Sequence, residues 1–207
     1  MKVIVSAMLL LLGGLGYAEF AGAQEEVQIR PVDVYISGFG GYSFPLNTTL
    51  SSSGFIVAQD VEYENSPSFG GKVGLWVTAP RKTLGIDIGA EIDVTHFDPD
   101  PTLNATYFGV NFMARMPMGI EPALPNGRWF PYIGFGGGAQ RLCFEAFGFK
   151  ESNTVPAFQG LGGVKVFLVR QVAVFVEGKF THASHTLSSL DFTLNTVHGV
   201  GGLSLHF

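Results

Sequence analysis

Apolar and non-apolar residues alternate along most of this chain, in runs of nine to fifteen residues. A period of two puts successive side chains on opposite faces of an extended strand, so each run predicts a β-strand with one apolar face. We count eight such runs: Val32–Tyr42, Phe69–Val77, Leu84–Thr95, Leu103–Met116, Trp129–Leu142, Val155–Val169, Val172–Ala183 and Thr193–Phe207. The pattern therefore predicts an all-β fold of eight strands.

The run from Leu84 to Thr95 shows the alternation most clearly. Its even-numbered positions are all apolar, whereas Asp87, Glu91 and Asp93 stand at odd-numbered ones. A soluble β-sandwich can show the same alternation, but its strands average about 5–6 residues. A tilted strand that crosses a membrane needs about 9–11 residues. The lengths of the eight runs favour the membrane.

Charge follows the same division of faces. Nine charged residues lie on the less apolar faces of the runs: Asp33, Lys72, Asp87, Glu91, Asp93, Arg115, Lys165, Glu177 and Lys179. The apolar faces carry no charge until Arg141, near the end of its run. Because Lys or Arg facing lipid costs about 2–4 kcal/mol at the membrane centre, we assign the apolar faces to lipid and the nine charges to an interior. Lipid offers no hydrogen-bond partners to a sheet edge, so the strands must close into an eight-stranded antiparallel up-and-down transmembrane β-barrel.

The start of the chain reads as a targeting segment. Lys2 precedes an apolar stretch from Val3 to Leu15, and Ala21-Gly22-Ala23 has the small-x-small pattern of a cleavage site. This arrangement is typical of a secretory signal peptide, whereas a membrane helix needs about 20 apolar residues. We expect a signal peptide over 1–23 and a barrel domain over 24–207, in the outer membrane of a Gram-negative-type bacterium.

Composition narrows the function classes. Charged residues make up 14% of the chain, against a typical ~25%, and the sequence contains 28 glycines and 19 phenylalanines. This composition excludes a disordered chain. A net charge of −5 without a basic stripe argues against binding to nucleic acid. The single cysteine, Cys143, has no partner for an internal disulfide, and we expect neither a cofactor nor a metal.

The breaks between runs give the expected connections. If the first strand starts in the periplasm, the outer connections are 43–68, 97–102, 143–154 and 184–195, and the inner turns are 78–83, 117–128 and 170–171. Longer connections outside and shorter turns inside are usual for such barrels. The first outer connection is rich in Ser, Thr and Asn, which predicts a mobile, surface-exposed segment.

The interior of an eight-stranded barrel is just wide enough for its own side chains, so the charges must pair. Counting back from the expected turns gives the pairs Lys165–Glu177, Lys72–Asp87, Lys72–Glu91 and Arg115–Asp87. We therefore predict a plug held by salt bridges. The alternative is a small-conductance pore.

Four stretches carry a family resemblance: Pro131–Gly138, Gly160–Lys165, Glu177–His182 and Gly201–Phe207. With them the chain resembles the small outer-membrane β-barrels of the outer-membrane protein A type, over nearly all of 24–207. The resemblance implies a monomer surrounded by outer-membrane lipid and lipopolysaccharide. It also implies that the terminal Phe207 is an assembly signal read by the barrel-insertion machinery. The role would be structural, or would be interaction with an unidentified surface ligand through the outer loops.

An enzymatic alternative rests on three residues. His182 and Ser184 are two apart and share the outward face of their strand, and Asp191 follows in the last outer connection. A serine, a base and an acid that orients the base are the parts of an acyl-ester hydrolase. The arrangement is similar to the lipid A deacylase family, which implies lipid A as the substrate.

Overall fold

The computed structural model describes residues 30–46, 48–52, 55–61, 64–100, 102–146, 149–187 and 190–207. The expected signal peptide, 1–23, lies outside these residues. Within them, no helix is both long and apolar enough to cross a membrane.

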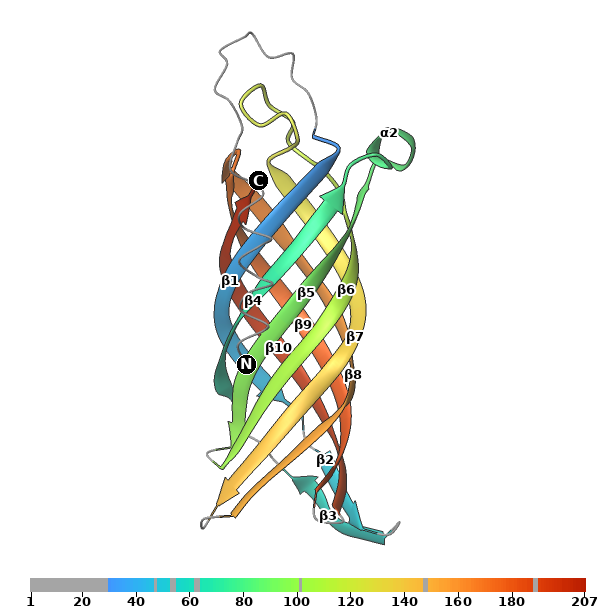
Figure 1. Cartoon of the computed structure of the whole chain (residues 1–207), viewed down its shortest axis with the longest axis vertical. Coiled ribbons are helices and arrows are strands. Elements are labelled where there is room, and N and C mark those ends of the chain that lie inside the picture. The colour runs from blue at the N-terminus through green and yellow to red at the C-terminus, as the bar shows by residue number, and fades with distance from the viewer. Residues whose placement is uncertain are drawn as a thin grey trace, which may run out of the picture.

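Eight strands form the wall of a closed barrel (Figure 1). They are β1 (Val32–Pro45), β4 (Ser66–Val77), β5 (Asp87–Asp100), β6 (Leu103–Arg115), β7 (Trp129–Ala146), β8 (Phe149–Val169), β9 (Val172–Leu187) and β10 (Leu190–His206). Each pairs antiparallel with the next, and β1 pairs with β10 from Tyr35↔His206 to Pro45↔Thr196. The predicted eight-stranded up-and-down antiparallel barrel is confirmed.

Two further strands lie within the first outer connection. β2 (Thr48–Ser52) and β3 (Phe55–Val61) form a hairpin, and β2 joins β10 through the pair Asp191↔Ser51. The hairpin therefore continues the barrel sheet past its rim. It lies at the end of the barrel opposite the short helix α2 (Arg81–Leu84), as Figure 1 shows.

The predicted start of the third strand is wrong by three residues. Arg81–Leu84 forms the single turn of α2, and Gly85 ends it with a left-handed φ of 73°. Glycine adopts this conformation at no steric cost, so the chain reverses there and the strand begins at Asp87. The apolar alternation runs on through Leu84 and Ile86, and this explains the early start that the sequence predicted.

The outer connections after the first are shorter than predicted. The strands continue as paired ladders up to Asp100↔Leu103, Ala146↔Phe149 and Leu187↔Leu190. The expected loops 97–102, 143–154 and 184–195 are therefore mostly strand. The apolar alternation stops where the outer face becomes polar, but backbone hydrogen bonding does not depend on that alternation.

The connections at the α2 end differ in length. The turn at 170–171 is tight, with Val169 paired to Val172. The longer connection 117–128 folds back on itself, since Arg128 donates its backbone N–H to the Met118 carbonyl and Glu121 is bridged to Leu124. This fold places Leu124 against the end of the barrel interior.

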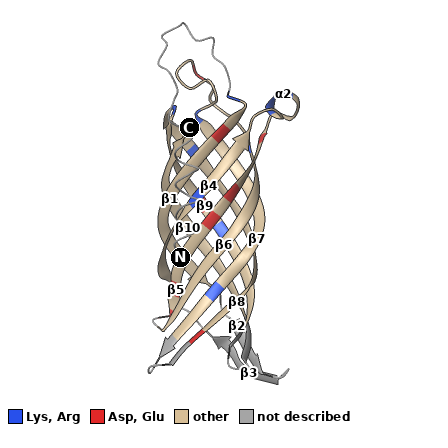
Figure 2. Ribbon diagram, in the orientation of Figure 1, with Lys and Arg blue, Asp and Glu red and all other residues tan. Residues whose placement is uncertain are grey.

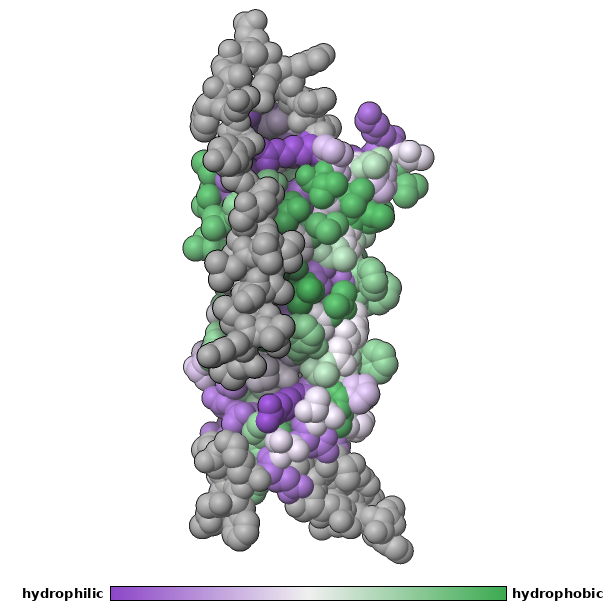
Figure 3. Space-filling model, viewed as in Figure 1, coloured by the Kyte–Doolittle hydropathy of each residue, from purple (hydrophilic) through white to green (hydrophobic). Residues whose placement is uncertain are grey.

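The two faces of the barrel wall differ as the alternation predicts. Large apolar side chains stand outward, including Phe135 and Val176, each 72% exposed. Figure 3 shows apolar residues over the middle of the barrel and more hydrophilic ones toward both ends, and Figure 2 shows charged positions along the strands. On β9, Phe180 is the last apolar outward side chain before His182 and Ser184. The exterior therefore carries an apolar band that ends at a polar rim.

Candidate functional site in the barrel interior

The interior of the barrel holds the charged side chains. All nine residues assigned to it from the sequence are buried, with exposed fractions of 0 to 8%. They come from six of the eight barrel strands. Alternate residues of a strand face the same side, so the two strands that contribute more than one of these charges, β5 and β9, carry them at even spacings.

A central cluster joins two lysines to three carboxylates. Lys72 Nζ lies 2.6 Å from Glu177 Oε1 and 3.1 Å from Glu91 Oε1. Lys179 Nζ lies 2.7 Å from Asp93 Oδ2 and 3.8 Å from Glu177 Oε1. Glu177 is therefore shared by both lysines, and the pair Lys72–Glu91 is the one expected from the sequence.

Hydroxyl groups complete this cluster. Tyr35 donates its hydroxyl to Glu91 at 2.6 Å, and Tyr132 donates to Glu177 at 2.8 Å. Lys179 donates to the Thr95 hydroxyl at 3.0 Å. Such extra hydrogen bonds offset part of the cost of removing the charges from water. The two tyrosines were missed from the sequence, although each falls on the inward parity of its strand.

A second cluster lies toward the α2 end. Arg115 Nε lies 2.8 Å from Asp87, and its Nη2 lies 2.9 Å from Asp33. Arg81 Nε donates to Asp87 at 2.7 Å, and His206 Nδ1 lies 2.7 Å from Asp33. The pair Arg115–Asp87 is expected from the sequence. Arg81 was missed because it belongs to the turn, where no alternation indicates which way its side chain points.

The expected pair Lys165–Glu177 is wrong. Val169 pairs with Val172, as the tight turn requires, but the register shifts by one residue between Phe167 and Val169. Lys165 therefore lies opposite Phe175, and its Nζ contacts Ser204 Oγ at 3.1 Å. A bulge of this kind cannot be counted from the turn alone.

The expected pair Lys72–Asp87 is wrong too, because each residue is held by other partners. Asp87 binds Arg81 and Arg115, whereas Lys72 binds Glu91 and Glu177.

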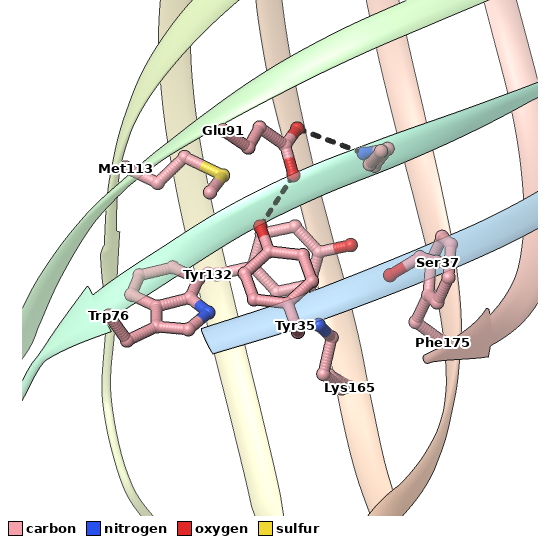
Figure 4. A pocket seen from close by; sticks show the side chains of 9 residues that line it. Tyr35, Ser37, Trp76, Glu91, Met113, Tyr132, Lys165 and Phe175 are labelled. Atoms are coloured by element: carbon pink, nitrogen blue, oxygen red, sulfur yellow. Dashed lines mark hydrogen bonds and ion pairs between the residues drawn. The ribbon is translucent and has the colours of Figure 1, made fainter. Parts of the chain in front are cut away.

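Apolar clusters lie beyond the charges at both ends of the interior. At the α2 end, Leu124 packs with Phe130, Phe167 and Ala173. At the other end the cluster consists of Phe97, Leu103, Ala105, Leu142 and Leu194. Figure 4 shows the side chains that line a hollow in the interior, among them Tyr35, Lys165 and Glu91. Its free space is about 10 Å³, close to that of one water molecule. This hollow is thus nearly filled by the side chains around it.

The residues of the enzymatic alternative lie on the outside. His182 and Ser184 are exposed on β9. His182 Nδ1 is 2.7 Å from Asn195 Oδ1, and Ser184 Oγ is 3.2 Å from Thr193 Oγ1. Among the described side chains no hydrogen bond joins His182 to Ser184. The backbone of Asp191 pairs with Thr186, and its side chain lies outside the described part.

The residue that resembles an assembly signal, Phe207, follows directly after β10. Its side chain is 56% exposed, and its backbone N–H donates to the Val34 carbonyl at 2.9 Å. The aromatic ring therefore stands at the seam between β1 and β10, at the α2 end.

No family model matches the chain, and no curated protein matches its sequence. Several solved structures are similar. Neisserial surface protein A matches with a TM-score of 0.52 and 12% identity, over 84% of this chain and 97% of that one. The N-terminal β-barrel domain of Pseudomonas aeruginosa OprF gives a TM-score of 0.48 at 10% identity, over 84% and 97%. The attachment invasion locus protein of Yersinia pestis gives 0.42 at 12%, over 82% and 97%.

At such low identity the likeness to Neisserial surface protein A is one of fold. It confirms the resemblance to the small eight-stranded outer-membrane barrels.

Proposed function

We propose that this protein is an integral outer-membrane β-barrel with a closed, salt-bridged interior, and that its role is structural or lies in surface interactions at one rim. The observation that carries the proposal is the inverted distribution of side chains. The wall exposes residues such as Ile133 and Phe158, 69% and 67% exposed, while Lys179 and Glu177 are buried at 2%.

Water is a poor solvent for this exterior. A soluble monomer rarely exposes a contiguous apolar patch larger than a few hundred Å². In lipid the same surface is stable, provided that every backbone hydrogen bond of the spanning strands is made. The pairing of β1 with β10 meets this requirement, because it leaves no open edge in the barrel wall.

The connections support an orientation. β1 starts and β10 finishes at the α2 end, where the tight turn 170–171 also lies. The longest connection, with the β2–β3 hairpin, lies at the other end. Periplasmic turns are short and extracellular loops longer in such barrels, so the α2 end faces the periplasm. A signal peptide over residues 1–23 is consistent with this orientation, because it would deliver the chain to the periplasm, where β1 starts.

The opposite rim is the proposed contact surface. His182 and Arg141 stand exposed on the outward face just past the apolar band, at the depth of the lipopolysaccharide headgroups. Beyond them the β2–β3 hairpin extends the sheet and is the element we propose for a surface ligand. At the other end, Phe207 is placed for recognition by the assembly machinery.

Labelling of single cysteines tests this proposal. In a Cys143→Ser background, Ser152→Cys and Lys82→Cys each introduce one thiol at an exposed position, at opposite ends of the barrel. An impermeant maleimide should label Ser152→Cys in intact cells, and Lys82→Cys only after the outer membrane is opened. The reverse pattern would contradict the orientation. Recovery of the protein in the soluble fraction would contradict membrane insertion.

A further inference from the structure

A furrow crosses the outer face of the barrel near the α2 end. It has a volume of about 640 Å³ and is lined by residues of β4, β5, β6 and β7. Its floor includes Ala90 and Ala114. All of its lining residues are apolar, and the furrow lies within the band that contacts lipid.

The pairing of the strands explains why the furrow exists. Ala114 lies between Ile88 of β5 and Ile133 of β7, which are 46% and 69% exposed. Ala90 lies between Leu75 of β4 and Phe112 of β6. The two alanines are diagonal neighbours across β5 and β6. Two methyl groups thus stand between much longer side chains, which leaves a narrow diagonal channel.

The segment that follows β4 at the α2 end of the furrow carries exposed positive charge, and the exposed Glu121 of the connection 117–128 lies 3.6 Å from Arg128. Between residues 78 and 90 the only acidic residue is Asp87, which is buried and bound to Arg81 and Arg115. Lys82, in contrast, is exposed on α2, directly after β4. The Thr78 hydroxyl donates a hydrogen bond to the backbone carbonyl of Arg30. Arg30, which is also exposed, therefore lies at this end of β4 as well.

We propose that this furrow binds one acyl chain of an anionic diacyl phospholipid, whose phosphate group lies beside Lys82 and Arg30. The inference rests on the proposed membrane insertion. A narrow channel between side-chain ridges suits a single flexible hydrocarbon chain, whereas a second barrel would offer ridges of its own. Among the described residues neither Lys82 nor Arg30 forms a salt bridge, and their positive charges complement the phosphate.

Native mass spectrometry of the detergent-purified, folded protein tests the proposal. The probes are dioleoylphosphatidylglycerol, which is anionic, and dioleoylphosphatidylcholine, which is zwitterionic. Wild-type protein should retain one molecule of the anionic lipid after the detergent is stripped. Ala114→Phe fills the furrow and should lose this adduct. The matched control is Gly199→Phe, in the apolar band of β10, where an added Cβ meets nothing within 4 Å. It should retain the lipid.

A second variant tests the headgroup separately. Lys82→Glu changes a residue on the exposed turn α2, outside the strands of the barrel wall, and should weaken retention of the anionic lipid while leaving the zwitterionic lipid unchanged. Equal retention by wild type and Ala114→Phe would overturn the proposal. So would a dimer that Ala114→Phe dissociates, since the furrow would then be an interface between copies. Failure of the proposed function itself would show differently, as a protein that stays soluble without detergent.

Discussion

Glu177 is the residue on which the central interior cluster depends most. Its carboxylate accepts hydrogen bonds from Lys72 at 2.6 and 2.7 Å and from Tyr132 at 2.8 Å, and Lys179 lies 3.8 Å away. The side chain is fully buried. The inward position of this carboxylate could be predicted, because Glu177 lies on the less apolar face of an alternating run. Its contacts with Lys72 and Tyr132 could not, because these residues belong to strands that are distant in sequence.

Replacing Glu177 by glutamine should destabilise the barrel by about 3–5 kcal/mol, because two buried lysines then lose a shared counter-charge. Urea unfolding in lipid vesicles measures the change. Glu121→Gln is the matched control, since its ion pair with Arg128 is 3.6 Å long and about half exposed. The control should cost less than about 1 kcal/mol. Equal effects of the two variants would refute the importance of the cluster.

His185 gives the rim a dependence on pH. It lies on β9 beyond Phe180, outside the apolar band, and burial lowers the pKa of its side chain to about 4. In the unfolded chain this histidine takes up a proton below about pH 6.5, whereas in the folded protein it does so only near pH 4. The contribution of His185 is therefore present above pH 6.5 and is lost as the pH falls from 6.5 to 4.

His185→Gln should reduce the loss of unfolding free energy between pH 7 and pH 4.5. Urea titrations of both proteins at the two pH values measure this difference. An unchanged pH dependence in the variant would show that His185 does not titrate in this way.

Strands β6 and β7 approach closely where β7 carries a run of glycines. A Cβ on Gly138 would lie 2.1 Å from the Phe108 carbonyl oxygen and 2.4 Å from Gly109 Cα. The presence of each strand could be predicted, since a period of two is a property of neighbouring residues. Strand ends and registers could not. The ladder continues past the apolar band to Ala146↔Phe149, and one bulge moves Lys165 away from Glu177.

Gly138→Ala should therefore lower the stability and the folding yield of the barrel, because the backbone of β6 cannot yield as a flexible side chain can. Gly160→Ala is the control, since nothing lies within 4 Å of its added Cβ. It should fold as wild type does. The fraction of folded, heat-modifiable protein on a gel after refolding into vesicles measures both. A normal yield for Gly138→Ala would contradict the close approach.

The whole molecule is a barrel whose inside is polar in the middle and apolar at its ends. Eight strands and their closure could be predicted, because lipid leaves no other arrangement for such segments. The end clusters could not. Leu124 reaches its position through the fold of the aperiodic connection 117–128, and Leu142 meets Leu194 only after the strands have paired. The β2–β3 hairpin likewise shows no regular alternation.

Conductance across a planar lipid bilayer tests the central claim most directly. Folded protein, with its insertion verified by heat-modifiable mobility, is added at increasing amounts, and the current is recorded over a range of voltages. We predict no stable current steps, because the charged clusters and the apolar clusters at both ends fill the interior. Steady, voltage-independent steps of large amplitude would contradict a closed interior and would identify the protein as a pore.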